Sequence, residues 1–278
     1  MATSTPSEVL DRAVLSIGGW AIGRFAFAGG VVGLLLNSLI SIIRFPFIKN
    51  VAIRSVFMKQ IYFSGLESTK IVILLALILG TVIVSQVVGL VGANSGSLIG
   101  KVLVWVVFRE LGPLLTAIIV IARSGTAIAT ELGSMKLNGE FETLELLGIP
   151  PERYLILPRI AGVMTGVLVL TTYFVITAFI GGFLFSYFVY HSPYSQFVQG
   201  IFASMGPLEV IVFAIKSICF GLIIPLICCQ SGLSVGNSAT EIPQAATRAV
   251  INSLFSVFLL DGLITFASTY ISRTIMGG

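Results

Sequence analysis

Long runs of apolar residues without charge recur along the chain, and their length is the first clue to its fold. Residues 71–100 and 160–208 contain no Asp, Glu, Lys or Arg. A bilayer core about 30 Å thick is crossed by roughly 20 helical residues, so each run is long enough to span it. The pattern predicts five membrane-spanning helices, at 71–93, 102–130, 153–189, 208–229 and 246–270.

The uncharged run 160–208 needs further division, because it is too long for one perpendicular helix and short for two with a turn. We expect a long helix that ends near residue 189. A loop with the sequence HSPYSQFVQGIFASMGP should follow at 191–207 and lead into the fourth span.

The N-terminal region contains a further apolar stretch, the uncharged 19 residues 25–43, with basic residues on both sides. Positive charge favours the cytoplasmic side of a membrane, so both ends of this stretch are expected there. A helix at about 8–45 that lies in the membrane interface, or re-enters it, is therefore favoured over a sixth span.

Composition confirms that lipid is the solvent. Of the 278 residues, 56% are hydrophobic and only 10% are charged, whereas soluble domains carry about 25% charged residues. The small net charge of +4 gives no nucleic-acid footprint. The sequence predicts an all-α integral membrane protein with one domain at 1–278.

Orientation follows from the Lys and Arg residues between the spans. Residues 1–70 hold seven, 131–159 hold three and 190–207 hold none. Because cytoplasmic loops are enriched in Lys and Arg, the N-terminus and the 131–159 segment are expected in the cytoplasm. Five spans then place the C-terminus on the outer side.

Two motifs resemble catalytic signatures but do not satisfy them. GSLIGK at 96–101 has three residues between its glycines and lacks the Ser or Thr that a phosphate loop needs. GLSVG at 232–236 matches a nucleophile elbow, but the single histidine, His191, is expected on the opposite membrane face. We expect no catalytic residue, metal site or bound cofactor in this chain.

Charged residues fall inside the predicted spans, among them Arg109 and Glu110 in the second, Glu209 and Lys216 in the fourth and Asp261 in the fifth. Arg109 either pairs within the bundle or extends its side chain to the outer surface. Asp261 lies between apolar residues and should face protein, where it takes a hydrogen bond or a cation. Lys216 beside Arg109 and Glu110 would form a mixed-charge pocket suited to an anionic or zwitterionic amphiphile.

The predicted cytoplasmic segment contains a short amphipathic helix in EFETLELLG. Phe141, Leu144 and Leu147 share one face, and Glu142 and Glu145 lie three residues apart. Gly148 suits the end of this helix and Pro150 prevents its continuation. An apolar face outside the membrane indicates a partner protein, although a solvated surface loop is the simpler alternative.

Several stretches of the sequence resemble those of a known family. The ungapped stretch RELGPLLTAIIVIARSGTAIATELGSMKLNGEFETLELLGIPPERYLILPR, the triplet IKS at 215–217, and ATRAVINS before the aspartate of LLDGLITF closely resemble the MlaE/YrbE-type permeases. These are membrane subunits of ABC transporters that work with MCE-domain proteins. The resemblance covers residues 60–272 well.

The resemblance implies a homodimer in the bacterial inner membrane that moves phospholipid or a similar amphiphile between inner and outer membranes. Two copies of a cytoplasmic ATPase, which binds ATP and Mg, and a periplasmic MCE-domain protein are its expected partners. The family's lipid cavity corresponds to Arg109, Glu110 and Lys216. Its ATPase-coupling segment corresponds to 131–148, with Glu131, Met135, Lys136, Phe141, Glu142, Leu144, Glu145 and Leu147.

Two other functions fit the residues alone. Asp261 or Glu110 could carry protons in a secondary transporter, and the chain could be a membrane scaffold for a partner complex. The docking helix separates these readings, because a secondary transporter does not require one.

Overall fold

The structure is a computed structural model that describes residues 29–34, 36, 51–92, 96–190, 194–236 and 238–276. The chain forms two compact units, Met1–Pro46 and Phe47–Gly278. In the first unit the described residues are helical, and the rest of the helix predicted at 8–45 lies outside the described residues.

Every element described in the second unit is a helix, and five helical stretches are long and apolar enough to cross a membrane. This confirms the predicted all-α membrane fold and its five spans. The stretches are Arg54–Leu90, Gly96–Leu137, Glu152–Tyr190, Pro207–Leu233 and Glu241–Thr274.

The first three spans contain short π-helical segments. The first consists of α2 (Val51–Ile61), η2 (Tyr62–Leu66) and α3 (Glu67–Val91). The second consists of α4 (Gly96–Leu103), η3 (Val104–Leu111), α5 (Gly112–Val120), η4 (Ile121–Gly125) and α6 (Thr126–Leu137). The third consists of η5 (Glu152–Ile156) and α8 (Leu157–Tyr190). Such π turns are frequent at functional sites, and η3 carries Arg109 and Glu110.

The first span begins well before the predicted residue 71. The prediction stopped there because Glu67 and Lys70 are charged. Glu67, however, forms an ion pair with Arg123 of η4, and its carbonyl oxygen accepts a 3.0 Å hydrogen bond from Arg123 Nη1. The guanidinium also lies 5.6 Å from the ring centroid of Phe63. These contacts compensate the charge of Glu67, so the helix continues through it.

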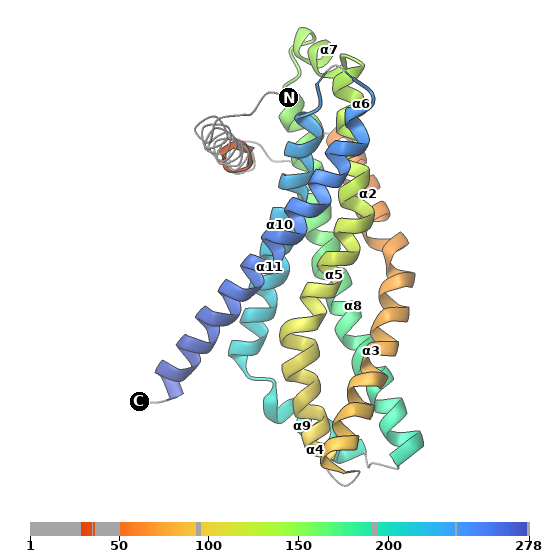
Figure 1. The fold of residues 1–278 in the computed structure, drawn as a ribbon, viewed down its shortest axis with the longest axis vertical. Helices are drawn as coiled ribbons and strands as arrows, with labels where there is room; N and C mark the ends of the chain where they lie inside the picture. Colours follow the sequence, from red (N-terminus) through yellow and green to blue (C-terminus); the bar gives the residue numbers. More distant parts are fainter. Residues whose placement is uncertain are drawn as a thin grey trace, which may run out of the picture. The chain divides into compact units, whose positions relative to one another are not determined.

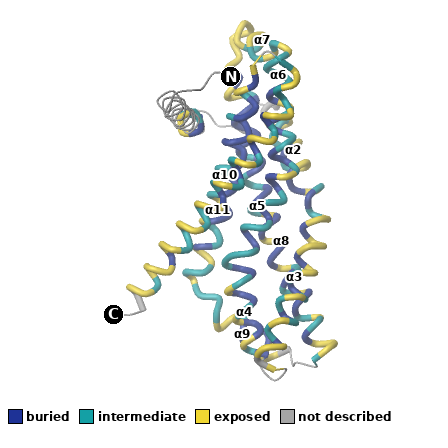
Figure 2. The backbone as a smooth tube through the Cα atoms, viewed as in Figure 1, coloured by how far each residue is buried: buried dark blue, intermediate teal, exposed yellow. Residues whose placement is uncertain are grey.

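The spans pack side by side, with α7 (Glu140–Leu146) at one end of the bundle and α4 and α9 (Tyr194–Ser204) at the other (Figure 1). Helix α8 packs against α3 and also against α10 (Pro207–Leu233), which in turn contacts α11 (Glu241–Met276). Leu103, Val120, Phe174 and Phe220 are fully buried between them. The dark tube through the middle of the bundle in Figure 2 marks this core.

The prediction of a loop at 191–207 is wrong for residues 194–204, because these residues form helix α9. Phe197 of this helix is buried, and α9 packs closely on α4. A Cβ at Gly200 would overlap the carbonyl oxygen of Ser97, and one at Gly100 would overlap that of Phe197. Two glycines thus allow the backbones to approach each other, a feature that hydropathy alone does not reveal.

The C-terminal part of α11 leans away from the other helices and is largely exposed (Figures 1 and 2). Its exposed side chains include the large aromatic residues Phe255, Phe258, Phe266 and Tyr270. Aromatic surface of this extent is unfavourable in water. On a membrane-spanning helix it therefore faces lipid tails or another protein.

The turn after α7 matches its prediction. Gly148 has a φ of +72°, and its N–H donates to Glu145 O at 2.9 Å while the N–H of Ile149 donates to Leu144 O at 2.9 Å. This pair of hydrogen bonds is a Schellman motif, which favours glycine at this position. Pro150 and Pro151 follow, and the third span starts at Glu152.

Candidate functional site

Five charged side chains from three spans meet inside the bundle and form what we call the charge cluster. Two cations lie among three carboxylates, although the bundle around them is apolar. The members are Arg109 and Glu110 of η3, Glu209 and Lys216 of α10, and Asp261 of α11. The structure therefore brings together Arg109, Glu110 and Lys216, as predicted.

Lys216 occupies the centre of the charge cluster, and its side chain is completely buried. Its Nζ atom lies 2.5 Å from Glu110 Oε2 and 2.7 Å from Asp261 Oδ1. It also donates a 2.8 Å hydrogen bond to the hydroxyl of Thr265. The hydrogen bonds to Glu110 and Thr265 use two of the three N–H donors of the ammonium group. The contact with Asp261 is an ion pair, and Asp261 Oδ1 accepts no hydrogen bond from the described residues.

Arg109 ties the second span to the fourth and fifth. Its Nη1 donates to Glu209 Oε1 at 3.0 Å, and its Nη2 donates to the hydroxyls of Ser268 at 2.9 Å and Thr269 at 3.1 Å. The side chain is only 12% exposed. Of the two alternatives for Arg109, the structure therefore shows the first: the side chain is paired within the bundle and does not extend to the surface.

Helix α11 supplies a polar stripe that the sequence analysis missed. Thr265 donates to Glu110 Oε2 at 3.0 Å, and Ser268 and Thr269 both contact Arg109. Together with Asp261 they occupy positions i, i+4, i+7 and i+8, which lie on one helix face. That spacing was the available signal. Glu209 was likewise visible as an intramembrane charge but was not assigned to the site.

The charge cluster contains more hydrogen-bond acceptors than its own donors satisfy. Its formal charge is one negative, because Glu110, Glu209 and Asp261 outnumber Arg109 and Lys216. Glu209 Oε2 is buried without a hydrogen-bond partner among the described residues. A buried acceptor of this kind favours a ligand that brings a hydrogen-bond donor or positive charge.

Aromatic packing fixes η3 against α10 beside the charge cluster. The rings of Phe108 and Phe213 stack with centroids 4.5 Å apart. Phe108 precedes Arg109, and Phe213 lies one helical turn before Lys216. Val104 and Val175 extend this contact into an apolar layer, so the charged groups border a surface that suits hydrocarbon.

The predicted coupling segment divides into two parts. Glu131, Met135 and Lys136 belong to α6 and contact the chain's own bundle. Glu131 Oε1 lies 2.9 Å from Arg159 Nη2, Met135 Sδ lies 3.8 Å from the same nitrogen, and Lys136 Nζ donates to Leu233 O at 2.6 Å. These three residues anchor the segment, and their coupling role stays a prediction.

Helix α7 forms the outward part of the segment and buries none of its residues. Glu142, Glu145 and Leu147 are exposed, and Phe141 and Leu144 are half-buried. A groove of about 420 Å³ runs beside the helix between Phe141, Glu145, Pro150, Pro151, Glu152, Ile156 and Leu233. An exposed helix next to a partly apolar groove can receive a partner's side chains.

The catalytic-looking motifs have ordinary structural roles. Ser234 of GLSVG caps the end of α10, and its hydroxyl donates to Ser231 O at 2.7 Å. His191 lies outside the described residues. Within the described ranges, no three His, Cys, Asp or Glu side chains are arranged to hold a metal ion.

Five membrane-length helices around buried charges define a multi-pass membrane protein, and comparison with known proteins identifies its class. The chain matches the family described as Permease MlaE over residues 57–267. It belongs to that family. Its resemblance to the MlaE permeases is thereby confirmed, and it is a membrane permease subunit of the ABC transporter type, which implies an ATPase partner.

The chain is also similar to several known proteins. A probable ABC transporter permease protein of Rickettsia prowazekii is 30% identical over 244 residues, 87% of this chain and 92% of the relative. A probable ABC transporter permease protein of the alga Pyropia yezoensis is 31% identical over 210 residues, covering 75% and 80%. The chloroplast protein TRIGALACTOSYLDIACYLGLYCEROL 1 of Arabidopsis thaliana is 33% identical over 163 residues, covering 59% and 47%.

Proposed function

We propose that this permease moves phospholipid, or a similar hydrophobic amphiphile, between the inner and outer membranes of a bacterium. The observation that carries the proposal is the charge cluster inside an apolar bundle. A charge in the bilayer centre costs about 2.5–3.5 kcal/mol on insertion scales, so five charged side chains here point to a function. An amphiphile would place its headgroup at the cluster and its tails along the apolar layer of Phe108 and Phe213.

The surplus carboxylate sharpens the expected headgroup. Lys216 is paired within the chain, whereas Glu209 Oε2 and Asp261 Oδ1 accept no hydrogen bond from the described residues. A zwitterionic headgroup that carries an ammonium group beside its phosphate fits this arrangement better than a purely anionic one. One relative also carries the name of a galactolipid, which supports a lipid as the transported substance.

The proposed partners would bind at opposite ends of the bundle. Two copies of a cytoplasmic ATPase, which binds ATP and Mg, would dock at α7 and its groove. A periplasmic MCE-domain protein would bind at the opposite end, near α4 and α9. The N-terminus would be cytoplasmic and the C-terminus periplasmic, because basic residues favour the cytoplasmic side. The exposed apolar face of α11 supports association of two copies into a homodimer.

In this arrangement the chain is the non-catalytic subunit, and ATP hydrolysis takes place in the partner. Its own contribution is to bind the headgroup and to transmit motion from the docking helix. The second span supports this coupling, because Gly96–Leu137 is one continuous helical stretch that joins η3 to the α7 end.

Lipid identification by mass spectrometry of the purified protein tests the proposal. The variant Arg109→Gln/Glu209→Gln removes both charges of one pair, and Glu110, which also contacts Arg109, keeps its pair with Lys216. The matched control, Glu67→Gln/Arg123→Gln, removes another ion pair between spans, which lies outside the cluster.

We expect the unchanged protein and the control to retain phospholipid after purification, and the cluster variant to retain several-fold less. Equal retention by the cluster variant and the control, with both eluting as single species on size exclusion, would contradict a headgroup site at the charge cluster.

A further inference from the structure

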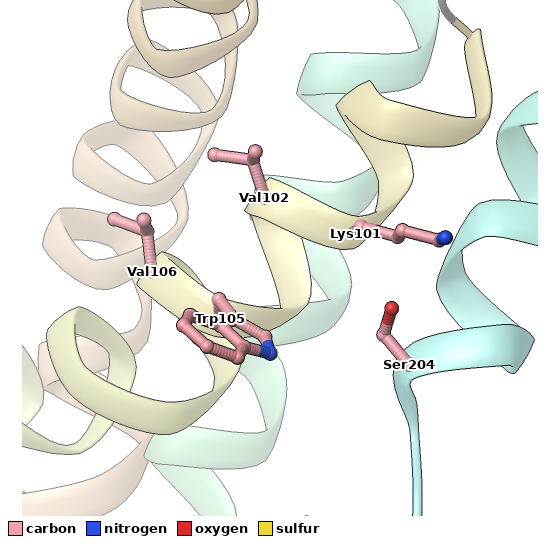
Figure 3. A pocket seen from close by; sticks show the side chains of 5 residues that line it. All are labelled: Lys101, Val102, Trp105, Val106 and Ser204. Carbon is pink, nitrogen blue, oxygen red and sulfur yellow. The ribbon is translucent and has the colours of Figure 1, made fainter.

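A second groove lies at the end of the bundle opposite to α7. It has a volume of about 420 Å³ and is lined by Lys101, Val102, Trp105, Val106 and Ser204. These residues come from α4, η3 and the last residue of α9. In Figure 3 the Lys101 side chain extends toward α9, the Ser204 hydroxyl points toward the Lys101 side chain, and the indole nitrogen of Trp105 faces the same space.

Three hydrogen-bond donors in this groove have no protein partner. Among the described residues, no side-chain hydrogen bond or ion pair involves Lys101, Trp105 or Ser204. An ammonium and an indole N–H only donate, and a serine hydroxyl can donate. Three unused donors around one hollow, one of them positively charged, are complementary to an anionic oxygen group.

The position of the groove restricts what that anion belongs to. Lys101 lies five residues after Gly96, the start of the second span, which is about 7.5 Å along a helix. Trp105 is 64% exposed and follows one turn later. Lysine and tryptophan at this depth are typical of the zone where lipid headgroups meet hydrocarbon.

The groove also has an apolar wall. Val102 and Val106 are half-buried, and the broad face of the indole adds apolar surface beside them (Figure 3). Inorganic phosphate would gain nothing from such a wall, whereas the first carbons of an acyl chain would bury against it.

We propose that this groove is a binding site for the phosphodiester of a membrane phospholipid, separate from the charge cluster. Lys101, Ser204 and the indole N–H of Trp105 hold the phosphate oxygens, and one acyl chain lies against Val102 and Val106. The site does not depend on phospholipid being the transported substance, because a resident lipid would use the same contacts.

If phospholipid is the transported substance, the position of the groove also gives it a role on the transport path. Lys101, Trp105 and Arg109 follow one another at intervals of four residues, which puts them close to one face of the helix. A phospholipid bound at the groove is therefore about two helical turns from the charge cluster, and the groove would hold it on its way to or from the cluster.

The fluorescence of Trp105 provides a local test. The chain has two tryptophans, so the variant Trp20→Phe reports on Trp105 alone. In detergent, this protein is titrated with phosphatidylglycerol brominated on its acyl chains, with brominated diacylglycerol, and with inorganic phosphate as competitor. The same titrations are run with Lys101→Ala/Ser204→Ala added, and with Lys70→Ala added as the matched control for loss of an exposed lysine.

We expect saturable quenching by brominated phosphatidylglycerol, with the half-saturation concentration raised about fivefold or more by Lys101→Ala/Ser204→Ala, since one basic residue near a membrane surface contributes about that factor. Lys70→Ala should have no effect, and brominated diacylglycerol should quench only weakly and without saturation. The comparison of the two lipids needs no groove variant, so it stands even if the double variant does not fold.

Three results would overturn the proposal. Equal quenching by both lipids would mean ordinary boundary lipid at this surface. An unchanged half-saturation in the folded double variant would mean that Lys101 and Ser204 do not hold the phosphate. Displacement of the brominated lipid by inorganic phosphate at millimolar concentration would assign the groove to the free ion.

Discussion

Lys216 shows at the residue scale why the charge cluster is stable in an apolar bundle. It is fully buried, yet its ammonium lies between Glu110 and Asp261, which belong to different helices. A buried charge is tolerated when it is paired and its hydrogen bonds are satisfied. The same contacts hold three spans together, so the cluster contributes both to the fold and to the proposed headgroup site.

Replacement of Lys216 by methionine should therefore destabilise the protein strongly. The substitution leaves the Asp261 carboxylate without its cation. Removal of one partner from a buried ion pair lowers the free energy of unfolding by about 3–5 kcal/mol. The unfolding midpoint in detergent measures this. The triple variant Lys216→Met/Glu110→Gln/Asp261→Asn should recover most of the loss, and a triple variant no more stable than the single one would argue against this pairing.

The sequence identified the site only in part, and individual residues explain why. Arg109, Glu110, Lys216 and Asp261 could be selected because a charge in an apolar run is rare. Thr265 could not, because threonine is common in membrane helices and usually bonds to its own helix, as Thr171 does with Val167 O. Which helices meet depends on packing, and hydropathy contains no such information.

At the scale of the elements, the number of spans could be predicted but some boundaries could not. The apolar runs determine how many helices cross, because length and hydropathy decide it. The start of the first span was placed too late, since the pairing of Glu67 with Arg123 is a tertiary contact. Helix α9 was taken for a loop because its stability comes from close packing against α4.

The contact between α4 and α9 gives a test at Gly200. A Cβ there overlaps the backbone of Ser97, whereas one at Gly206 meets nothing within 4 Å. Gly200→Ala should force the helices apart and cost about 1–3 kcal/mol, the usual range for overpacking. Gly206→Ala is the control. Unfolding midpoints that are equal for the two variants would disprove the close approach.

Helix α7 gives a test of docking. Glu142 and Glu145 lie three residues apart on an exposed face, and reversing both charges should weaken association with the ATPase by at least about tenfold, since charge complementarity governs such contacts. Glu140→Lys is the control, because Glu140 is also exposed and lies on the opposite side of the helix. Pull-down titration of the ATPase measures the difference, and equal affinities for the two variants would exclude docking at this face.

At the scale of the whole second unit, the charge cluster and helix α7 lie far apart, and the second span runs between them. From Arg109 to Lys136 the second span runs for 27 residues, which is about 40 Å at 1.5 Å per residue. Lys136 is bonded to Leu233 at the end of α10, and α10 carries Lys216. A displacement at α7 can therefore reach the charge cluster along two helices at once.

The most direct test of the account is ATP-driven lipid movement by the reconstituted transporter. The permease and its ATPase are placed in liposomes, and transfer of a labelled phospholipid is followed with and without ATP. We expect transfer that needs ATP and that falls at least about tenfold in Arg109→Gln/Glu209→Gln, while the ATPase stays bound. Transfer that a pH gradient drives without the ATPase, or ATP-driven transfer unchanged in that variant, would contradict the account.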